Sequence, residues 1–263
     1  MKNRIKLSEI IAIVALIGFT LAACDTSDKE EERAIEVEID GIKYQGENNN
    51  TTISVRSYNG SGGHVTILAE VQGKPVTVIW NHAFYNKPEL TGVTIPNSVT
   101  RIGSGAFSIT GLTSVVIPDS VKIIESGAFA YYENGKSKLT NVTIGSGVTE
   151  IESQAFYLTG LVNVVIPDNV KTIGTQAFCT SNNYNAETQE GYIHTLASVK
   201  IGANVTLSSS DINGTISSVF GYQGGSAVNG LLDDLYNNGG KLAGTYIRSP
   251  DSENPYYGKW TKQ

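Results

Sequence analysis

Histidine and cysteine are the side chains of this sequence that could do chemistry, as general base, nucleophile or metal ligand. The three histidines are His64, His82 and His194, and the two cysteines are Cys24 and Cys179. No two histidines stand at the spacing of a zinc-binding helix, the acidic residues follow no calcium-loop pattern, and the glycines form no phosphate-binding loop. Cys179 has no histidine near it in the sequence, which favours an inert thiol over a reactive one. We therefore expect no enzyme activity, no cofactor and no metal site.

Cys24 is different, because the residues before it have the order of an export signal. Basic residues near the start are followed by an apolar run, 10–21, that is too short to favour a membrane span. The tetrapeptide Leu21-Ala22-Ala23-Cys24 resembles a bacterial lipobox, in which the cysteine thiol receives a diacylglycerol and the preceding peptide is removed. The alternatives are an ordinary signal peptide and a membrane anchor with an incidental cysteine. The lipobox predicts an exported protein, lipid-anchored to a bacterial membrane at the outer membrane or cell surface.

The charge of the chain limits its partners. The full sequence of 263 residues has a formal charge of −6. Removal of residues 1–23 takes away three basic residues and Glu9, which leaves 16 basic and 24 acidic residues and a charge of −8. An acidic chain without a basic stripe argues against a nucleic-acid partner. Residues 24–34 are charged and lack an apolar pattern, which indicates a tether between lipid and folded domain; a membrane-sorting signal is the alternative.

A repeat unit organises the middle of the chain. Each copy has Leu followed by Val (+3), Ile (+5), Val (+9), Ile (+12), Ala (+16) and Phe (+17). All length variation falls between the Phe of one copy and the Leu of the next, as expected of a solenoid whose inserts leave at one edge. The alternation before Ile predicts one strand per copy, which ends at the proline that follows in three copies. The four copies are 90–107, 112–129, 139–156 and 161–178.

The pattern L-x-x-V-x-I-P-x-x-V-x-x-I-x-x-x-A-F, as in residues 112–129, resembles the BspA-like leucine-rich repeats of bacterial surface proteins. The resemblance covers residues 65–207, although the Gly-Cys pair that often follows Phe in that family is mostly absent. It implies a leucine-rich-repeat solenoid and a non-enzymatic role in adhesion to host, matrix or other bacterial proteins. The rival interpretation is a structural or assembly lipoprotein of the envelope that meets bacterial partners only.

The fold expected is a β-rich leucine-rich-repeat solenoid: a parallel β ladder with short helical or irregular turns at each Ala-Phe pair, and a cap at each end. A helix over 227–236 and strands over 243–248 and 256–260 make the C-terminal cap an α+β one, unless it is a separate small module. The repeat is expected to stop at Asn213, where a fifth Phe would fall. The predicted divisions are 1–23 (signal peptide), 24–34 (tether), 35–78 (N-terminal β cap), 79–207 (solenoid) and 208–263 (C-terminal cap).

The candidate binding surface is the outward side of the repeated strands. Because the +3 and +5 side chains point inward, the +2 and +4 side chains point out. Their residue types are equally those of ordinary exposed strands. Tyrosines of the inserts are a second candidate, since tyrosine is favoured at recognition surfaces. Tyr157 is as easily a cover for the core. The partner expected is an extracellular or envelope protein, bound by a monomer whose membrane contact is the lipid on Cys24. The candidates are Thr94, Ser114, Val116, Asn141, Thr143, Asn163 and Val165 on the strands, and Tyr131, Tyr132, Tyr184 and Tyr192 in the inserts.

Overall fold

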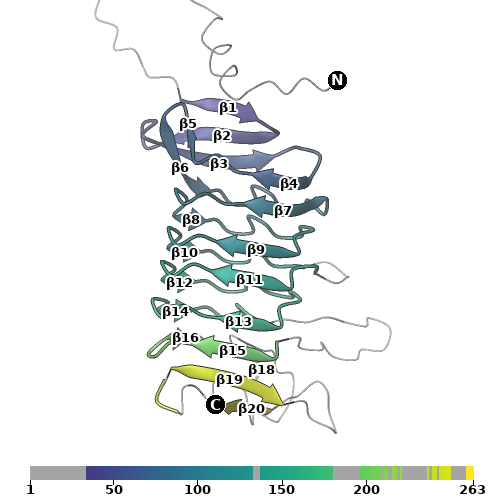
Figure 1. The fold of residues 1–263 in the computed structure, drawn as a ribbon, viewed down its shortest axis with the longest axis vertical. Coiled ribbons are helices and arrows are strands. Elements are labelled where there is room, and N and C mark those ends of the chain that lie inside the picture. Colours follow the sequence, from purple (N-terminus) through teal and green to yellow (C-terminus); the bar gives the residue numbers. More distant parts are fainter. Residues whose placement is uncertain are drawn as a thin grey trace, which may run out of the picture. The chain divides into compact units, whose positions relative to one another are not determined.

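A computed structural model describes residues 34–132, 137–179 and 196–208, with shorter pieces at 210–212, 215–217, 220, 236, 239–241, 243–249 and 259–263. These belong to one compact unit, Ala34–Gln263. Its strands lie one above another along the unit (Figure 1). The predicted signal peptide, Cys24 and nearly all of the tether lie outside the described residues.

The unit begins with an antiparallel meander. Strands β1 (Glu36–Ile39), β2 (Ile42–Glu47) and β3 (Thr52–Tyr58) pair in sequence order. The hairpin between β1 and β2 turns at Asp40-Gly41, where both residues adopt positive φ, 51° and 75°. β3 then pairs in parallel with β6 (Lys74–Ile79), which itself forms a small hairpin with β5 (Glu70–Val71). The meander thus continues directly into the parallel sheet of the repeats and covers the first turn of the core.

Each repeat contributes the predicted strand. These strands are β4 (Gly63–Thr66), β7 (Leu90–Thr94), β9 (Ser114–Ile117), β11 (Asn141–Ile144), β13 (Asn163–Val165) and β15 (Ser198–Ile201). Pairing is parallel and in register, so that Val115 lies beside Val142 and Ile117 beside Ile144. The hydrogen-bonded ladder is nevertheless interrupted, because β4 pairs with β7, β9 with β11, and β13 with β15. The neighbours β7 and β9 are not paired with each other.

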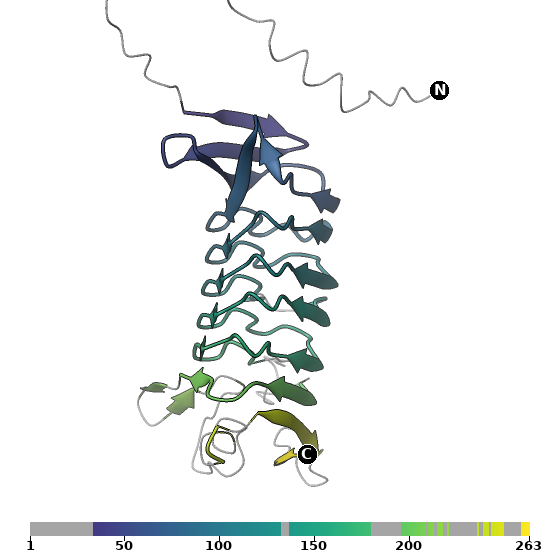
Figure 2. The same cartoon turned by 60° about the vertical axis from the view of Figure 1, so that its left-hand side comes forward.

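A second ladder runs down the other side of each turn, as Figure 2 shows. It starts at β6 and continues without a break through five two-residue strands. The sequence did not predict it, because two residues are too few to show alternation. This ladder ties every turn to the next where the first one is interrupted. Its short strands are β8 (Arg101–Ile102), β10 (Ile123–Ile124), β12 (Glu150–Ile151), β14 (Thr172–Ile173) and β16 (Thr206–Leu207).

The Ala-Phe segments are irregular turns that carry their own hydrogen bonds between repeats. From Phe84 to Phe156, the N–H of each column Phe donates to the carbonyl of the Ala one turn further along, at 2.7–2.8 Å. The residue two before each Phe has a left-handed φ of 58–63°, which glycine adopts without strain. This explains why the position varies in sequence: only its backbone conformation is fixed. The left-handed residues are His82, Gly105, Gly127, Gln154 and Gln176.

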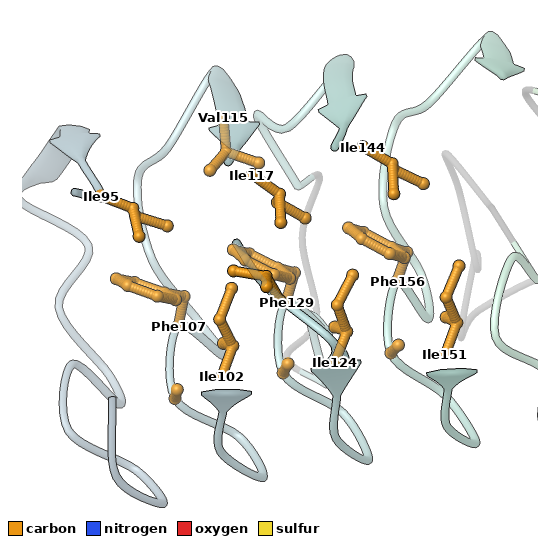
Figure 3. Close-up of a cluster of buried hydrophobic side chains, with 14 of the residues drawn as sticks. Ile95, Ile102, Phe107, Val115, Ile117, Ile124, Phe129, Ile144, Ile151 and Phe156 are labelled. Carbon is orange, nitrogen blue, oxygen red and sulfur yellow. The ribbon is translucent and has the colours of Figure 1, made fainter. Parts of the chain in front are cut away.

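A column of stacked phenylalanines fills the space between the two ladders (Figure 3). Neighbouring ring centroids from Phe84 to Phe178 are 4.9–5.2 Å apart and nearly parallel. Tyr58 of β3 closes the column at one end, 5.2 Å from Phe84. Apart from the partly buried Val142, the Leu, Val, Ile, Ala and Phe side chains at the recurring motif positions of the four repeats are buried. Aromatic rings, aliphatic ladders and backbone bonds therefore all connect the same neighbouring turns.

The expectation that the repeat stops at Asn213 is wrong. Phe220 is buried and stacks on Phe178 with 5.8 Å between ring centroids, so a fifth repeat adds a ring to the column. The hairpin of β17 (Ser210–Ile212) and β18 (Thr215–Ser217) occupies the extra length between Leu196 and this ring. A fixed spacing could not find Phe220, because the insert lies inside the unit rather than between units.

The C-terminal segment covers the last repeat by reversing strand direction. β19 (Gly244–Ser249) pairs antiparallel with β15, and β20 (Lys259–Lys262) pairs antiparallel with β19. Tyr236 is fully buried; its hydroxyl donates to the Gly202 carbonyl (2.8 Å) and accepts from the Val205 N–H (2.9 Å). Apart from Tyr236, the predicted helix over 227–236 lies outside the described residues.

Candidate partner-binding face

Four consecutive strands, β7, β9, β11 and β13, present an outward surface that carries no ionisable group. We call its twelve positions, at +1, +2 and +4 of each repeat, the neutral face. Eleven of them are exposed and Gly92 is half-buried, while Val116 and Val165 expose 63% and 57% of their surface. The sequence reasoning missed the +1 positions, which follow the buried Leu and precede the strand itself in three of the four repeats. The twelve residues are Thr91, Gly92, Thr94, Thr113, Ser114, Val116, Thr140, Asn141, Thr143, Val162, Asn163 and Val165.

The second ladder of the same four repeats is a natural comparison. Its twelve positions at +10, +11 and +13 include six charged residues, although most of these positions are half-buried and Gly103 is buried. Some of these charges pair, as between Arg101 Nη1 and Glu125 Oε1 at 2.6 Å. A surface designed for solubility aims for about 25–35% charged residues, which would place about three or four charges among twelve exposed positions. The lack of charge is therefore specific to the neutral face and is no general property of the solenoid. The six charged residues are Arg101, Lys122, Glu125, Glu150, Glu152 and Lys171.

A groove of about 750 Å³ crosses the neutral face. It lies over β7 and β9, where the first ladder is interrupted, and reaches β4 on one side and β11 on the other. The predicted residues Thr94, Ser114, Val116 and Thr143 line it. Asn141, Asn163 and Val165 belong to the same face outside the groove. The structure thus brings the seven strand candidates onto one surface and gives four of them a concave setting.

The two ionisable groups that border the groove already have hydrogen-bond partners. His64 Nε2 and Thr94 Oγ1 share a hydrogen bond of 2.8 Å. Asp119 Oδ1 accepts from both the N–H (2.6 Å) and the hydroxyl (3.0 Å) of Ser146. The groove therefore offers a ligand mainly hydroxyls, amides and methyl groups, with the imidazole of His64 and the carboxylate of Asp119 at its borders.

Gly92 keeps the groove open at the β4 side. A Cβ at this position would clash with the imidazole of His64. The other repeats carry Ser or Asn here, so the missing side chain was visible in the sequence as a departure from the repeat. The role of Gly92 was not visible in the sequence, because His64, which needs the space, stands 28 residues earlier in the chain.

The tyrosine candidates are not part of the neutral face. Tyr132 is 49% exposed beyond the Ala-Phe turn, with its hydroxyl donating to Gln154 Oε1 at 3.1 Å. Its ring centroid is 5.7 Å from that of Tyr157, and burial raises its pKa. Tyr131 lies half-buried beside it. Tyr85, which the sequence reasoning did not select, is a further exposed aromatic on this edge. The remaining candidates, Tyr184 and Tyr192, lie outside the described residues.

Cys179 is buried, which bears on the choice between an inert and a reactive thiol. Burial raises its pKa to about 12, so the nucleophilic thiolate is scarce at neutral pH. Within the described residues, no group of His, Cys, Asp and Glu side chains is placed to hold a metal ion. In the same part of the chain, no helix has the length and apolar character needed to cross a membrane.

Comparisons with known proteins give relatives by fold and by repeat, and no curated protein matches the sequence. A leucine-rich repeat protein from Bacteroides ovatus is 24% identical with a TM-score of 0.49, over 64% of this chain and 41% of that one. A leucine rich cell surface protein from Faecalibacterium prausnitzii is 22% identical with a TM-score of 0.37, over 69% and 57%. The pneumococcal vaccine antigen PcpA is 18% identical with a TM-score of 0.40, over 69% and 53%. This chain thus spans about two fifths of the Bacteroides ovatus protein and little more than half of the other two.

The family comparison rests on the repeats themselves. The model for the BspA type leucine rich repeat region matches six copies between residues 64 and 189. This span contains the four regular repeats and the β4–β6 turn before them. Residues 64–189 of this chain are therefore leucine-rich repeats of the BspA type.

Proposed function

We propose that this protein is a non-enzymatic binding protein of the bacterial cell surface, anchored by lipid on Cys24, which adheres to host, matrix or bacterial proteins through the neutral face. The observation that carries the proposal is that exposed, uncharged face with its groove. Solenoids use such extended surfaces to bind other proteins. The BspA-type repeats of residues 64–189 support a surface role of this kind.

The size of the neutral face limits how tightly one copy binds. Four strands about 4.8 Å apart and some five residues long cover an area on the order of 300 Å². A standard protein interface buries about 800 Å² on each partner. A single contact on this face is therefore weak unless the groove holds a well-buried side chain of the partner. Many copies anchored on one membrane would bind a multivalent partner through avidity.

A charge placed in the groove tests the proposal. The variant Val116→Asp is expected to weaken binding of the mature chain, residues 25–263, to a captured extracellular protein at least about tenfold, because the new carboxylate would be desolvated without a counter-charge. Folding is expected to be nearly unaffected, since Val116 is 63% exposed. The measurement is a pull-down from host extracellular proteins, followed by affinity determination.

Thr206→Asp is the matched control, because it adds the same charge at an exposed strand position of the second ladder. It is expected to bind like the unmodified chain. Equal binding by Val116→Asp and the unmodified chain would place the site elsewhere. The rival envelope function is separated on intact cells, where external protease is expected to remove this protein and would spare an inward-facing component.

The lipid anchor is tested separately. Cys24→Ser is expected to move the protein from the detergent phase to the aqueous phase of a Triton X-114 extract, because no acylated cysteine is formed. Cys179→Ser is the control, since it changes the other cysteine and leaves the lipobox intact. Retention of the Cys24→Ser variant in the detergent phase would show that something other than lipid on this thiol holds the protein.

A further inference from the structure

We propose that the segment of a protein partner which contacts the neutral face is itself uncharged: an extended stretch presenting Ser, Thr, Asn or Val side chains, without Lys, Arg, Asp or Glu at the contact. The proposal rests on the proposed function and specifies the partner of the same site. Binding at this face is then nearly independent of ionic strength, although the mature chain carries a charge of −8.

The contrast between the two ladders is the first observation. The neutral face has no charge at twelve outward positions, and the second ladder of the same repeats has six charges at twelve. Both ladders are built from the same four turns. Solubility and folding therefore tolerate charge on outward strand positions in this chain. We attribute the difference between the neutral face and the second ladder to binding. Electrostatic complementarity with an uncharged face requires a partner segment that is uncharged at the contact.

The groove borders give the second observation. Its ionisable neighbours, His64 and Asp119, already form hydrogen bonds with Thr94 and Ser146. An acidic side chain entering the groove would lose its water and meet no Lys or Arg among the lining residues. A basic one would meet a single carboxylate, Asp119 at the border, one oxygen of which already accepts two hydrogen bonds from Ser146. Burial of a charge is therefore unfavourable over most of the groove. A neutral hydroxyl or amide can exchange its water for the hydroxyls that line the groove. A small aliphatic side chain can pack on the exposed methyl groups of Val116.

The chemistry of the face favours polypeptide over carbohydrate as the neutral partner. None of its twelve positions carries an aromatic ring on which a sugar could stack. Some of its polar side chains instead bond to a neighbouring side chain: Asn141 Nδ2 donates to Thr140 Oγ1 on the face (3.0 Å), and Asn163 Oδ1 accepts from the hydroxyl of Ser198 on the next strand, β15 (2.7 Å). Thr, Ser, Asn and Val form columns across the face, as on an ordinary exposed sheet. Side chains of the same types on an extended partner segment can pack between these columns.

The experiment selects a phage-displayed random peptide library on the immobilised mature chain. Selected peptides are sorted by whether Val116→Asp abolishes their binding, with Thr206→Asp as control. Peptides sensitive to Val116→Asp are expected to be depleted in Asp, Glu, Lys and Arg relative to the library. Their affinities are expected to change less than about twofold between about 50 and 500 mM NaCl, a range over which the screening of exposed charges changes strongly.

The outcomes separate this inference from the function on which it rests. Enrichment of charged residues among the Val116-sensitive peptides, or an affinity loss of about tenfold or more across the salt range, would overturn the neutral partner and leave the binding face in place. If no selected peptide is sensitive to Val116→Asp, the face does not take polypeptide. Both this inference and the proposed use of the face then fail together.

Discussion

Replacing Phe129 by alanine is expected to lower the free energy of unfolding by about 3–5 kcal/mol, the range for a buried large-to-small aromatic substitution. The ring is 3% exposed and lies between Phe107 and Phe156, with 5.2 Å between centroids on each side. Alanine would remove the contacts to both neighbours at once and leave a cavity between the two ladders. Because each turn is stabilised mainly by its neighbours, loss in the middle of the column weakens the turns on either side.

Phe220→Ala is the matched comparison for this effect. In the column, Phe220 has a stacking partner at 5.8 Å, Phe178, where Phe129 has two partners. Its removal is therefore expected to cost about half as much free energy as that of Phe129. Urea unfolding of both variants, followed by far-UV circular dichroism, measures the difference. A cost below about 1 kcal/mol for Phe129→Ala would mean that the rings fill space without holding the turns together.

Replacing Tyr236 by alanine is expected to have the second largest effect, about 3–5 kcal/mol, concentrated in the last repeat. The side chain is fully buried, and its hydroxyl bonds both the Gly202 carbonyl and the Val205 N–H. Its ring also meets Tyr246 of β19 edge-on, with 6.1 Å between centroids. The substitution would remove the packing and leave two backbone groups of the final turn without their partner.

Tyr236→Phe separates packing from hydrogen bonding, because it keeps the ring and removes the hydroxyl. We expect it to cost about 1–3 kcal/mol, the penalty for leaving buried backbone groups unsatisfied. Hydrogen exchange locates the effect: protection of the Val205 amide should fall in both variants, while that of Ile124, in the middle of the second ladder, should stay unchanged. Equal loss at both positions would show that the unit unfolds as a whole and that Tyr236 has no local role.

The sequence predicted which strand side chains of the candidate site point outward, but it did not predict the groove. Alternation around Val115 and Ile117 was enough to place Ser114 and Val116 on the outside, because a strand turns successive side chains to opposite faces. The groove depends on the interrupted pairing of β7 and β9 and on His64 beside Gly92. Those are relations between turns, which no single repeat records. The tyrosines of the inserts were selected by residue type alone. Those that the structure describes, Tyr131 and Tyr132, lie beyond the Ala-Phe turns and not on the neutral face.

By itself, the sequence determined the repeating turn and its first strand, because the buried positions recur at fixed offsets and burial is a local consequence of that pattern. Only the tertiary structure decided how turns join. The two-residue strands of the second ladder exist because neighbouring turns supply their hydrogen-bond partners. The left-handed residues before each Phe accept that conformation because the stacked turn requires it. Phe220 enters the column although it stands at a different spacing from the other phenylalanines. The free face of the Phe178 ring is covered by any aromatic ring that the chain can bring to it, whatever the number of residues between them.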